Sequence, residues 1–355
     1  MHRDFYLDLA RQRLRMPIGT DLVLHEETHP EEARRNGAAL VNVVERTARR
    51  WNTPLALPLM DLCLEKTDLL ALAGVPERRA DRYHFSSPID AEAFEWMRGE
   101  QKVPVCARSR ARDEAIALIA KKPGLVPVGM VIGPFSLTTR LLADPITAAA
   151  RAGRGVAAKE SRMVRLLHQC LLLSEAAIHR SVRSQMRHGA KAIMVCEPAA
   201  STAFISPRQI KAGSNIFEEL VMAPNRRLKA GLDEMGCDLI FHNCGELTDA
   251  MVEAFAQQLR PVMLSLGSSR KLWEDARLVS SDVVLYGNLA TKSFYSDGAM
   301  PLAQVLGQAQ ALADKMNGCG HPFILGSECD LLFVREADEK IRRKVDAMIL
   351  GAIAA

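Results

Sequence analysis

Apolar residues follow two alternating patterns along the chain. One is a short apolar run that stops abruptly at polar side chains or glycine, as a buried parallel strand does. The other is a longer segment with apolar residues at helical spacing. We expect strands within 21–24, 54–61, 126–135, 192–198, 238–245, 261–266, 283–288 and 323–330, and helices near 1–14, 31–51, 136–190, 206–235, 246–258, 270–278, 301–317 and 335–353.

Strands that alternate with helices in this way indicate a parallel α/β protein. The roughly eight strand candidates favour a TIM (β/α)8 barrel. We expect one domain over residues 1–355, with helical additions at the N-terminus. A doubly wound open sheet is the alternative, but the chain has no G-x-G-x-x-G after its first strand. Its chemistry-bearing side chains also follow several different strands, as they do at the mouth of a barrel.

The composition is that of an ordinary soluble globular protein. Hydrophobic residues make up 48% of the 355 positions and charged residues 25%, which allows a sizeable core. The formal net charge is only +4 and aromatic residues are 5%, so neither a nucleic-acid groove nor a stacking platform is indicated.

No run approaches the about eighteen apolar residues of a membrane span, and the first residues lack a signal-peptide core. We expect a cytoplasmic protein with reduced cysteines.

His242 and Cys244 stand at the end of one strand candidate. Residues two apart in a strand point to the same face, so this H-x-C pair can reach one metal ion. Imidazole and thiolate favour zinc, and Cys329, at a similar strand end, would supply a third ligand. Three protein ligands leave one position open, which is typical of a catalytic zinc site. The alternative is that these residues belong to the core, where cysteine is common.

Two other groups of metal-binding residues compete with this one. Cys319 and His321 form a C-x-H pair, but they precede the last strand candidate and would lie at the N-terminal face of a barrel. That face rarely carries chemistry. His25 and His29 flank two glutamates between a strand candidate and a helix that starts at a proline. This arrangement is more typical of a solvated helix cap.

Carboxylates also stand where apolar runs stop, and we take Asp61 and Glu197 as candidate catalytic residues. Asp61 can orient a substrate or take part in acid–base chemistry, or it can cap the following helix. Glu197 and Glu328 are candidates for a fourth metal ligand or for a hydrogen bond to His242, and either can instead be a capping residue. Residues 76–104 are the least regular part of the chain and a candidate lid.

With these residues in place, the chain resembles the uroporphyrinogen decarboxylase superfamily, and within it the zinc-dependent methylcobamide methyltransferases that pass a corrinoid-borne methyl group to a thiol. The family's metal pattern is H-x-C followed far downstream by one Cys, which His242, Cys244 and Cys329 match. The resemblance covers nearly the whole chain. Its other segments are Gly-Pro-Phe-Ser-Leu at 133–137, Glu-Pro at 197–198 with Ile-Ser-Pro at 205–207, Gly-Asn-Leu at 287–289, and Ile-Leu-Gly-Ser-Glu-Cys-Asp-Leu at 324–331.

Two segments depart from the decarboxylases of the superfamily. Those enzymes carry an N-terminal R-Q-A-G-R-Y-type segment whose arginines grip the carboxylates of the tetrapyrrole. Residues 16–21 contain no arginine, which argues against porphyrinogen decarboxylation, although Asp61 lies near the place of the decarboxylases' catalytic aspartate. The family's G-N-x-D-P is broken by Ala290 and Thr291, so no role of that aspartate carries over.

The resemblance implies a Zn²⁺ ion, a methylcobamide (corrinoid) held on a partner protein, and a small methyl acceptor such as coenzyme M, another thiol or tetrahydrofolate. Two protein thiolates reduce the net charge of zinc and keep a substrate sulfur nucleophilic, which suits alkyl transfer. No nucleic acid or membrane partner is expected. The alternatives are demethylation of a small methylated substrate onto the corrinoid, a metal-free decarboxylase-like enzyme, and a non-catalytic barrel that serves as a binding subunit.

Overall fold

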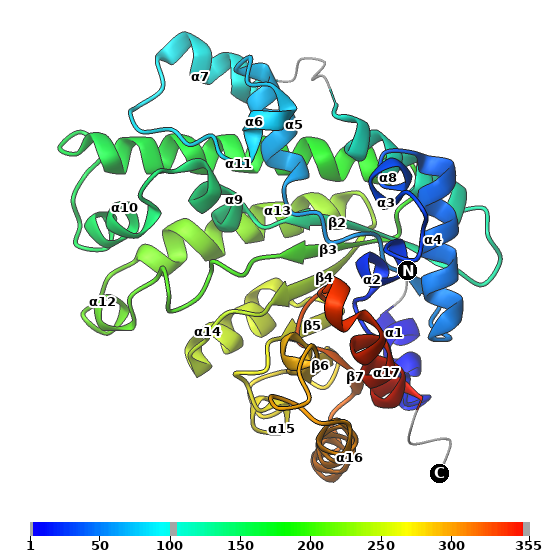
Figure 1. Ribbon diagram of the computed structural model, residues 1–355. Coiled ribbons are helices and arrows are strands. Elements are labelled where there is room, and N and C mark those ends of the chain that lie inside the picture. The colour runs from blue at the N-terminus through cyan, green and yellow to red at the C-terminus, as the bar shows by residue number, and fades with distance from the viewer. Residues whose placement is uncertain (1–2, 100–104, 351–355) are drawn as a thin grey trace.

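Seven parallel strands form one curled sheet in the computed structural model, which describes residues 3–99 and 105–350 (Figure 1). The strands pair in sequence order, so every connection is a crossover that carries helices. The fold is therefore α/β, with the curled parallel sheet of a TIM-like barrel. The strands are β1 (Leu55–Ala56), β2 (Val126–Ile132), β3 (Ala192–Cys196), β4 (Asp238–Asn243), β5 (Met263–Leu266), β6 (Val284–Leu289) and β7 (Phe323–Ser327).

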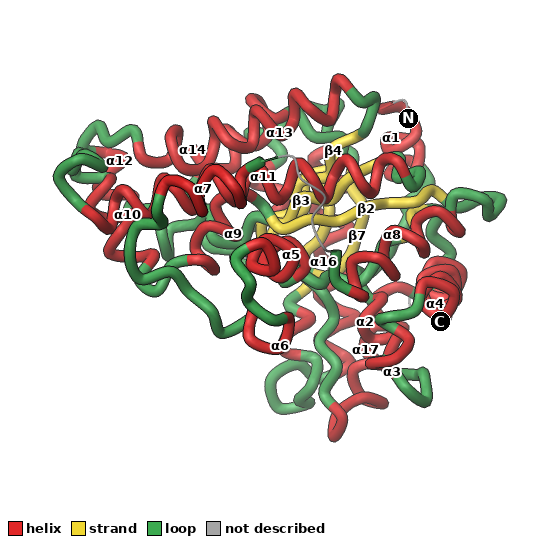
Figure 2. Tube along the Cα trace, turned by 90° about the horizontal axis from the view of Figure 1, so that it is seen from above, coloured by secondary structure: helices red, strands yellow, loops and turns green. Residues whose placement is uncertain are grey.

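Helices lie around the sheet, as the view from above shows (Figure 2). The α-helices are α1 (Arg3–Arg11), α2 (Thr20–Leu24), α3 (Pro30–Ala33), α4 (Gly37–Arg50), α5 (Leu64–Leu72), α6 (Glu77–Ala80), α7 (Ala91–Arg98), α8 (Ala107–Ile119), α9 (Pro134–Leu141), α10 (Pro145–Ala152), α11 (Arg162–Arg187), α12 (Pro207–Lys211), α13 (Ala223–Glu234), α14 (Asp249–Ala254), α15 (Leu272–Asp275), α16 (Leu302–Cys319) and α17 (Asp338–Ile349). Every expected strand from 54–61 onward overlaps one of the seven observed strands.

The two faces of the sheet belong to different apolar clusters. On β3, Met194 and Cys196 pack with the residues enclosed by the curled sheet, whereas Ile193 and Val195 pack against the surrounding helices. Successive side chains of a strand point to opposite faces, so both faces of a strand covered on both sides must be apolar. This explains why the strands appear in the sequence as continuous apolar runs.

Helix α1 covers the amino-terminal ends of the strands. Its Tyr6 and Leu9 pack into the enclosed cluster, and the Tyr6 hydroxyl donates a hydrogen bond to Asp238 at the start of β4 (3.0 Å). Arg3 donates to the backbone carbonyls of Pro261 and Asp282, which precede β5 and β6 (both 2.9 Å). The amino-terminal end of the sheet is therefore closed by side chains from the first helix.

The prediction of a strand at 21–24 is wrong, because these residues form α2. Leu22, Val23 and Leu24 are all buried, so the segment shows no alternation that separates a short strand from a short buried helix. The segment just before α2 is extended instead. In it, Arg15 and Ile18 form isolated parallel bridges with Leu325 of β7 and with Asp330.

The candidate lid at 76–104 contains two short helices, α6 and α7, joined by irregular backbone. Residues 100–104 of this segment lie outside the described residues, as do 1–2 of the first expected helix and 351–353 of the last. In the part of the chain that the structure describes, none of the helices combines the length and hydropathy needed to cross a membrane.

A buried ion pair network joins α5, α8 and α11. Arg112 is nearly inaccessible and contacts Glu65 (3.2 Å) and Asp113 (2.9 Å). Ser181 donates to Glu65 (2.7 Å), and Ser184 donates to Asp113 (2.5 Å). Removing one partner of such a network leaves buried charges without compensation.

We therefore expect Arg112→Ala to lower the free energy of unfolding by about 3–5 kcal/mol. Arg110→Ala, on an exposed position of the same helix, should change it by less than about 0.5 kcal/mol. Urea unfolding of both variants measures the difference. Equal effects of the two substitutions would contradict this account of the network.

Candidate metal centre

Three side chains from two strand ends converge at the carboxyl edge of the sheet. His242 belongs to β4, Cys244 follows it directly, and Cys329 follows β7. Their ligand atoms all lie within 4.8 Å of one another. Parallel strands bring their carboxyl ends to the same edge, which is why residues so far apart in the sequence meet. The structure thus brings together the three predicted metal ligands.

The imidazole of His242 is held by the neighbouring strand. Its Nδ1 lies 2.7 Å from Ser265 Oγ on β5, directly opposite His242 in the strand register. Its Nε2 is buried and has no hydrogen-bond partner among the described residues. When Nδ1–H donates to Ser265, Nε2 presents its lone pair to the two sulfurs. An unpartnered buried nitrogen beside two thiols fits a metal ion that prefers nitrogen and sulfur ligands.

The two thiols shift each other's pKa in opposite directions. A hydrogen bond from Cys329, together with the nearby charge of Lys292, lowers the pKa of Cys244 to about 7 against the opposing effect of burial. The same hydrogen bond and burial raise the pKa of Cys329 to about 12. One sulfur is therefore readily available as a thiolate, which is the form that binds metal.

The loop that carries Cys244 is fixed by backbone and amide contacts. Asn243 Nδ2 donates to the carbonyls of Glu197 (2.7 Å) and Ala200 (3.0 Å), and Asn243 Oδ1 accepts from the Gly245 amide (2.9 Å). A Cβ atom at Gly267 would lie 2.7 Å from the carbonyl oxygen of Cys244. Glycine at 267 therefore lets the loop after β5 approach the cysteine closely.

Glu197 is fully buried and its carboxylate is committed to the start of α9. It accepts hydrogen bonds from the Ser136 amide (2.6 Å), the Phe135 amide (3.3 Å) and Asn225 Nδ2 (3.0 Å). Burial raises the pKa of this carboxyl group, and the hydrogen bonds oppose the shift. The only group of metal-binding side chains found among the described residues does not include Glu197. Its contacts join the end of β3 to the start of α9 and to Asn225.

Glu328 precedes Cys329, and its carboxylate oxygens bond to neighbouring loops. Ser268 Oγ donates to it (2.5 Å), and so does the backbone amide of Lys292 (3.3 Å). These bonds tie the loops after β5, β6 and β7 together. The ammonium group of Lys292 affects the pKa of Cys244 through space, which adds a positive charge to this edge of the sheet.

Asp61 follows β1 and forms an ion pair with Arg108 of α8. Its other oxygen accepts a hydrogen bond from the Cys63 amide (3.2 Å). Both carboxylate oxygens of Asp61 therefore have partners within the protein. Like Glu197, Asp61 does not belong to the group of metal-binding side chains found among the described residues.

The competing groups of the sequence do not form a second cluster. Cys319 ends α16 and His321 precedes β7, so both lie at the amino-terminal end of the sheet, as expected from their order. His25 stacks on Phe333, with ring centroids 3.8 Å apart, and faces Asp21 at 3.6 Å. Neither pair contributes to a cluster of three metal-binding side chains in residues 3–99 or 105–350.

Sequence reasoning missed Ser265 and Cys196. Ser265 is fully buried and in register with His242, and Cys196 lies opposite His242 on the other neighbouring strand. Burial, followed by the charge of Cys329, raises the pKa of Cys196 far above its ordinary value. Only a strand register could have revealed these neighbours, because neither residue belongs to a recognisable motif.

The architecture is similar to that of a solved structure, a methyltransferase from Methanosarcina mazei. The two chains align with a TM-score of 0.63 at 14% sequence identity, over 96% of this chain and 93% of that chain. At this identity the likeness concerns the fold. A sequence search of curated proteins found no match.

The sequence pattern of one family, described as Uroporphyrinogen decarboxylase (URO-D), matches residues 84–348. The match includes six of the seven strands and all three residues of the candidate metal centre. It begins after β1 and Asp61, so the N-terminal additions lie outside it. Because the match spans most of the chain, this protein belongs to the uroporphyrinogen decarboxylase (URO-D) family.

Proposed function

We propose that the protein is a zinc-dependent, corrinoid-linked methyltransferase. It would move a methyl group between a methylated corrinoid on a partner protein and a small acceptor, either a thiol such as coenzyme M or tetrahydrofolate. The convergence of His242, Cys244 and Cys329 around an unpartnered imidazole nitrogen carries the proposal. Membership of the URO-D family and the fold likeness to a methyltransferase from Methanosarcina mazei support it.

The donor set fits the chemistry that such a transfer needs. Methyl transfer to a thiol breaks the cobalt–carbon bond, leaves its electron pair on cobalt, and forms a sulfur–carbon bond while the thiol proton passes to solvent. When bound, zinc would act as a Lewis acid that lets the acceptor thiol lose this proton near neutral pH. Cys244 and Cys329 would enter the site as thiolates, and His242 would contribute Nε2.

The surrounding residues hold these groups in place. Ser265 fixes the orientation of the His242 ring, and Glu197 holds β3 against the start of α9 through three hydrogen bonds. We assign Asp61 a positioning role as well, because it links the segment after β1 to Arg108. The decarboxylase alternative remains open at Asp61, whose carboxylate contacts Arg108 and the Cys63 amide.

Metal analysis tests the site directly. We expect about one zinc per chain in protein purified without chelators, and loss of that zinc in Cys244→Ser and Cys329→Ser. Cys319→Ser is the matched control, because Cys319 is exposed and lies at the other end of the sheet. It should retain the metal. A wild-type protein without zinc, or equal loss in the control, would refute the site.

Replacing Ser265 tests how the imidazole is oriented. Ser265→Ala should weaken zinc affinity roughly 10–100-fold, the usual effect of losing the group that orients a metal-bound histidine. Ser174→Ala is the control, since Ser174 is equally buried but its hydroxyl contacts Thr138. Competition with a chromogenic chelator measures both affinities. An unchanged affinity in Ser265→Ala would show that the hydrogen bond has no part in metal binding.

A demethylation assay tests the reaction. The wild-type protein should demethylate free methylcobalamin with at least one member of a panel of thiols and tetrahydrofolate. Cys329→Ser should lose more activity than the roughly 10–100-fold expected of Ser265→Ala, because it removes a ligand outright. A zinc-loaded protein that is inactive with the whole panel would contradict methyl transfer while leaving the metal site intact.

A further inference from the structure

A cavity of about 500 Å³, which we call the basic cavity, lies at the amino-terminal end of the sheet and is lined by Arg11, Arg13 and Arg15. His321 lines it as well, but burial lowers the pKa of its imidazole and favours the neutral form. None of the residues that line this cavity is an aspartate or a glutamate. A concave surface with several cations and no carboxylate concentrates anions.

The cavity is distinct from the metal centre. Phe323, the first residue of β7, lines the cavity, whereas Cys329 follows the other end of the same strand. Six residues of extended chain separate them by about 20 Å. Arg15 is anchored beside β7 through its bridge to Leu325 and the hydrogen bond from the Met16 amide to the Leu325 carbonyl (3.0 Å).

Arg11 and Arg13 are exposed, whereas Arg15 is partly buried. Among the described residues, Arg13 forms no ion pair or side-chain hydrogen bond, and Arg15 donates only to the carbonyl of Met348 (3.3 Å). Burial lowers the pKa of the Arg15 guanidinium, with no carboxylate to offset the shift. Arg11 pairs with Asp8 in an exposed contact. A half-buried guanidinium without an anion is unfavourable unless a ligand supplies one.

The backbone at Arg13 is also unusual for an arginine. It has a φ of 56°, in the left-handed region that favours glycine. The Leu14 amide bonds to the Leu9 carbonyl (3.1 Å) and the Arg13 amide to the Ala10 carbonyl (2.9 Å). This is the helix-ending motif whose left-handed position is usually glycine. Glycine would suit this backbone, so Arg13→Gly removes the guanidinium group without straining the chain.

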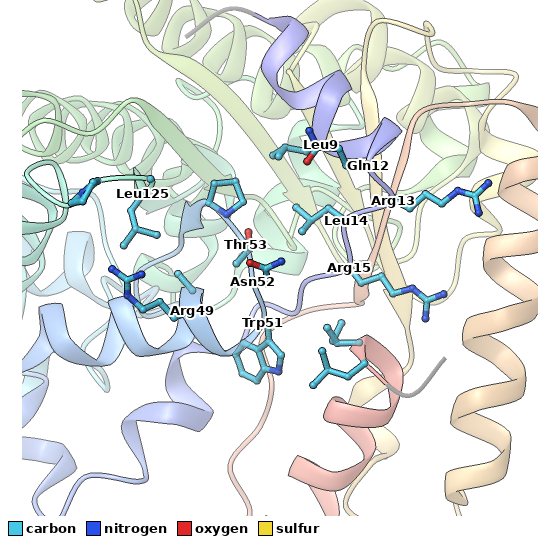
Figure 3. Close-up of a pocket in the computed structure, with 16 residues that line it drawn as sticks. Leu9, Gln12, Arg13, Leu14, Arg15, Arg49, Trp51, Asn52, Thr53 and Leu125 are labelled. Atoms are coloured by element: carbon cyan, nitrogen blue, oxygen red, sulfur yellow. The ribbon is translucent and has the colours of Figure 1, made fainter. Parts of the chain in front are cut away.

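A further cavity, of about 550 Å³, lies next to the basic cavity and shares Arg13, Leu14 and Arg15 with it. A close-up of this further cavity shows the direction of the two arginine side chains. Figure 3 shows Arg13 and Arg15 extending in the same direction, away from Trp51 and Thr53. Guanidinium groups on one side of the chain add their positive charges to the same region (Figure 3).

We propose that the basic cavity binds a phosphate-bearing small molecule, up to the size of a nucleotide. Guanidinium groups match the geometry of phosphate oxygens and bind them through paired hydrogen bonds. The volume falls within the range of small-molecule sites. Met316, Phe323 and Leu325 form an apolar wall of the cavity, against which the carbon framework of such a ligand would pack. This site is independent of methyl transfer.

Calorimetric titration of the full-length protein with inorganic phosphate, pyrophosphate, AMP and ATP at low salt tests the proposal. The wild type should bind at least one of the probes carrying two or more phosphates. Arg13→Gly should weaken that binding about tenfold or more, because a charge-assisted hydrogen bond is lost. The same variant should be no less stable than the wild type, since glycine suits the left-handed backbone.

Arg260→Gly is the matched control. Arg260 also has a left-handed backbone, with a φ of 43°, but it pairs with Asp282 outside the cavity. It should leave probe binding unchanged, as should Cys329→Ser at the metal centre. Absence of binding for all four probes would overturn the proposal. Equal weakening by Arg13→Gly and Arg260→Gly would do so too, because it would indicate nonspecific attraction of an adventitious ion only.

Discussion

The contact between His242 Nδ1 and Ser265 Oγ is the interaction on which the candidate metal centre depends. It joins two adjacent strands at residues that lie opposite each other, so the pairing of the sheet sets the direction of the ring. Once Nδ1 is occupied, Nε2 remains as the free ring nitrogen, and it is buried. A buried nitrogen without a partner costs about 1–3 kcal/mol, a cost that metal coordination would remove.

The two ends of the sheet are built for different chemistry. At the carboxyl ends, short loops present sulfur and imidazole, and glycine at 267 allows the backbone to come close to Cys244. At the amino ends, α1 closes the enclosed core with Tyr6 and Leu9, and the chain leaves the helix through an arginine-rich turn. The same strand, β7, connects Cys329 of the candidate metal centre to the wall of the basic cavity.

Much of the candidate metal centre could be predicted from the sequence, because its ligands stand where apolar runs end. His242, Cys244 and Cys329 are recognisable from ligand type and strand-end position alone. The hydrogen-bond partners of the strand-end carboxylates could not be predicted in the same way. Glu197 also follows a strand, yet its carboxylate oxygens accept hydrogen bonds from the first amides of α9 and from Asn225. These partners are distant from Glu197 in the sequence. A strand-end carboxylate can serve a metal or a helix, and the sequence pattern is the same for both.

The sequence by itself determined the alternation of strands and helices and the parallel α/β class, since burial on both faces leaves a local apolar signature. It also singled out the three side chains of the candidate metal centre. It did not distinguish a strand from α2 at residues 20–24, because a short, wholly buried segment has no periodicity to read. Only the tertiary structure decided which residues face one another across strands. Ser265 meets His242, and Arg15 lies beside β7 at a cavity wall, because strand register and chain packing are properties of the whole fold.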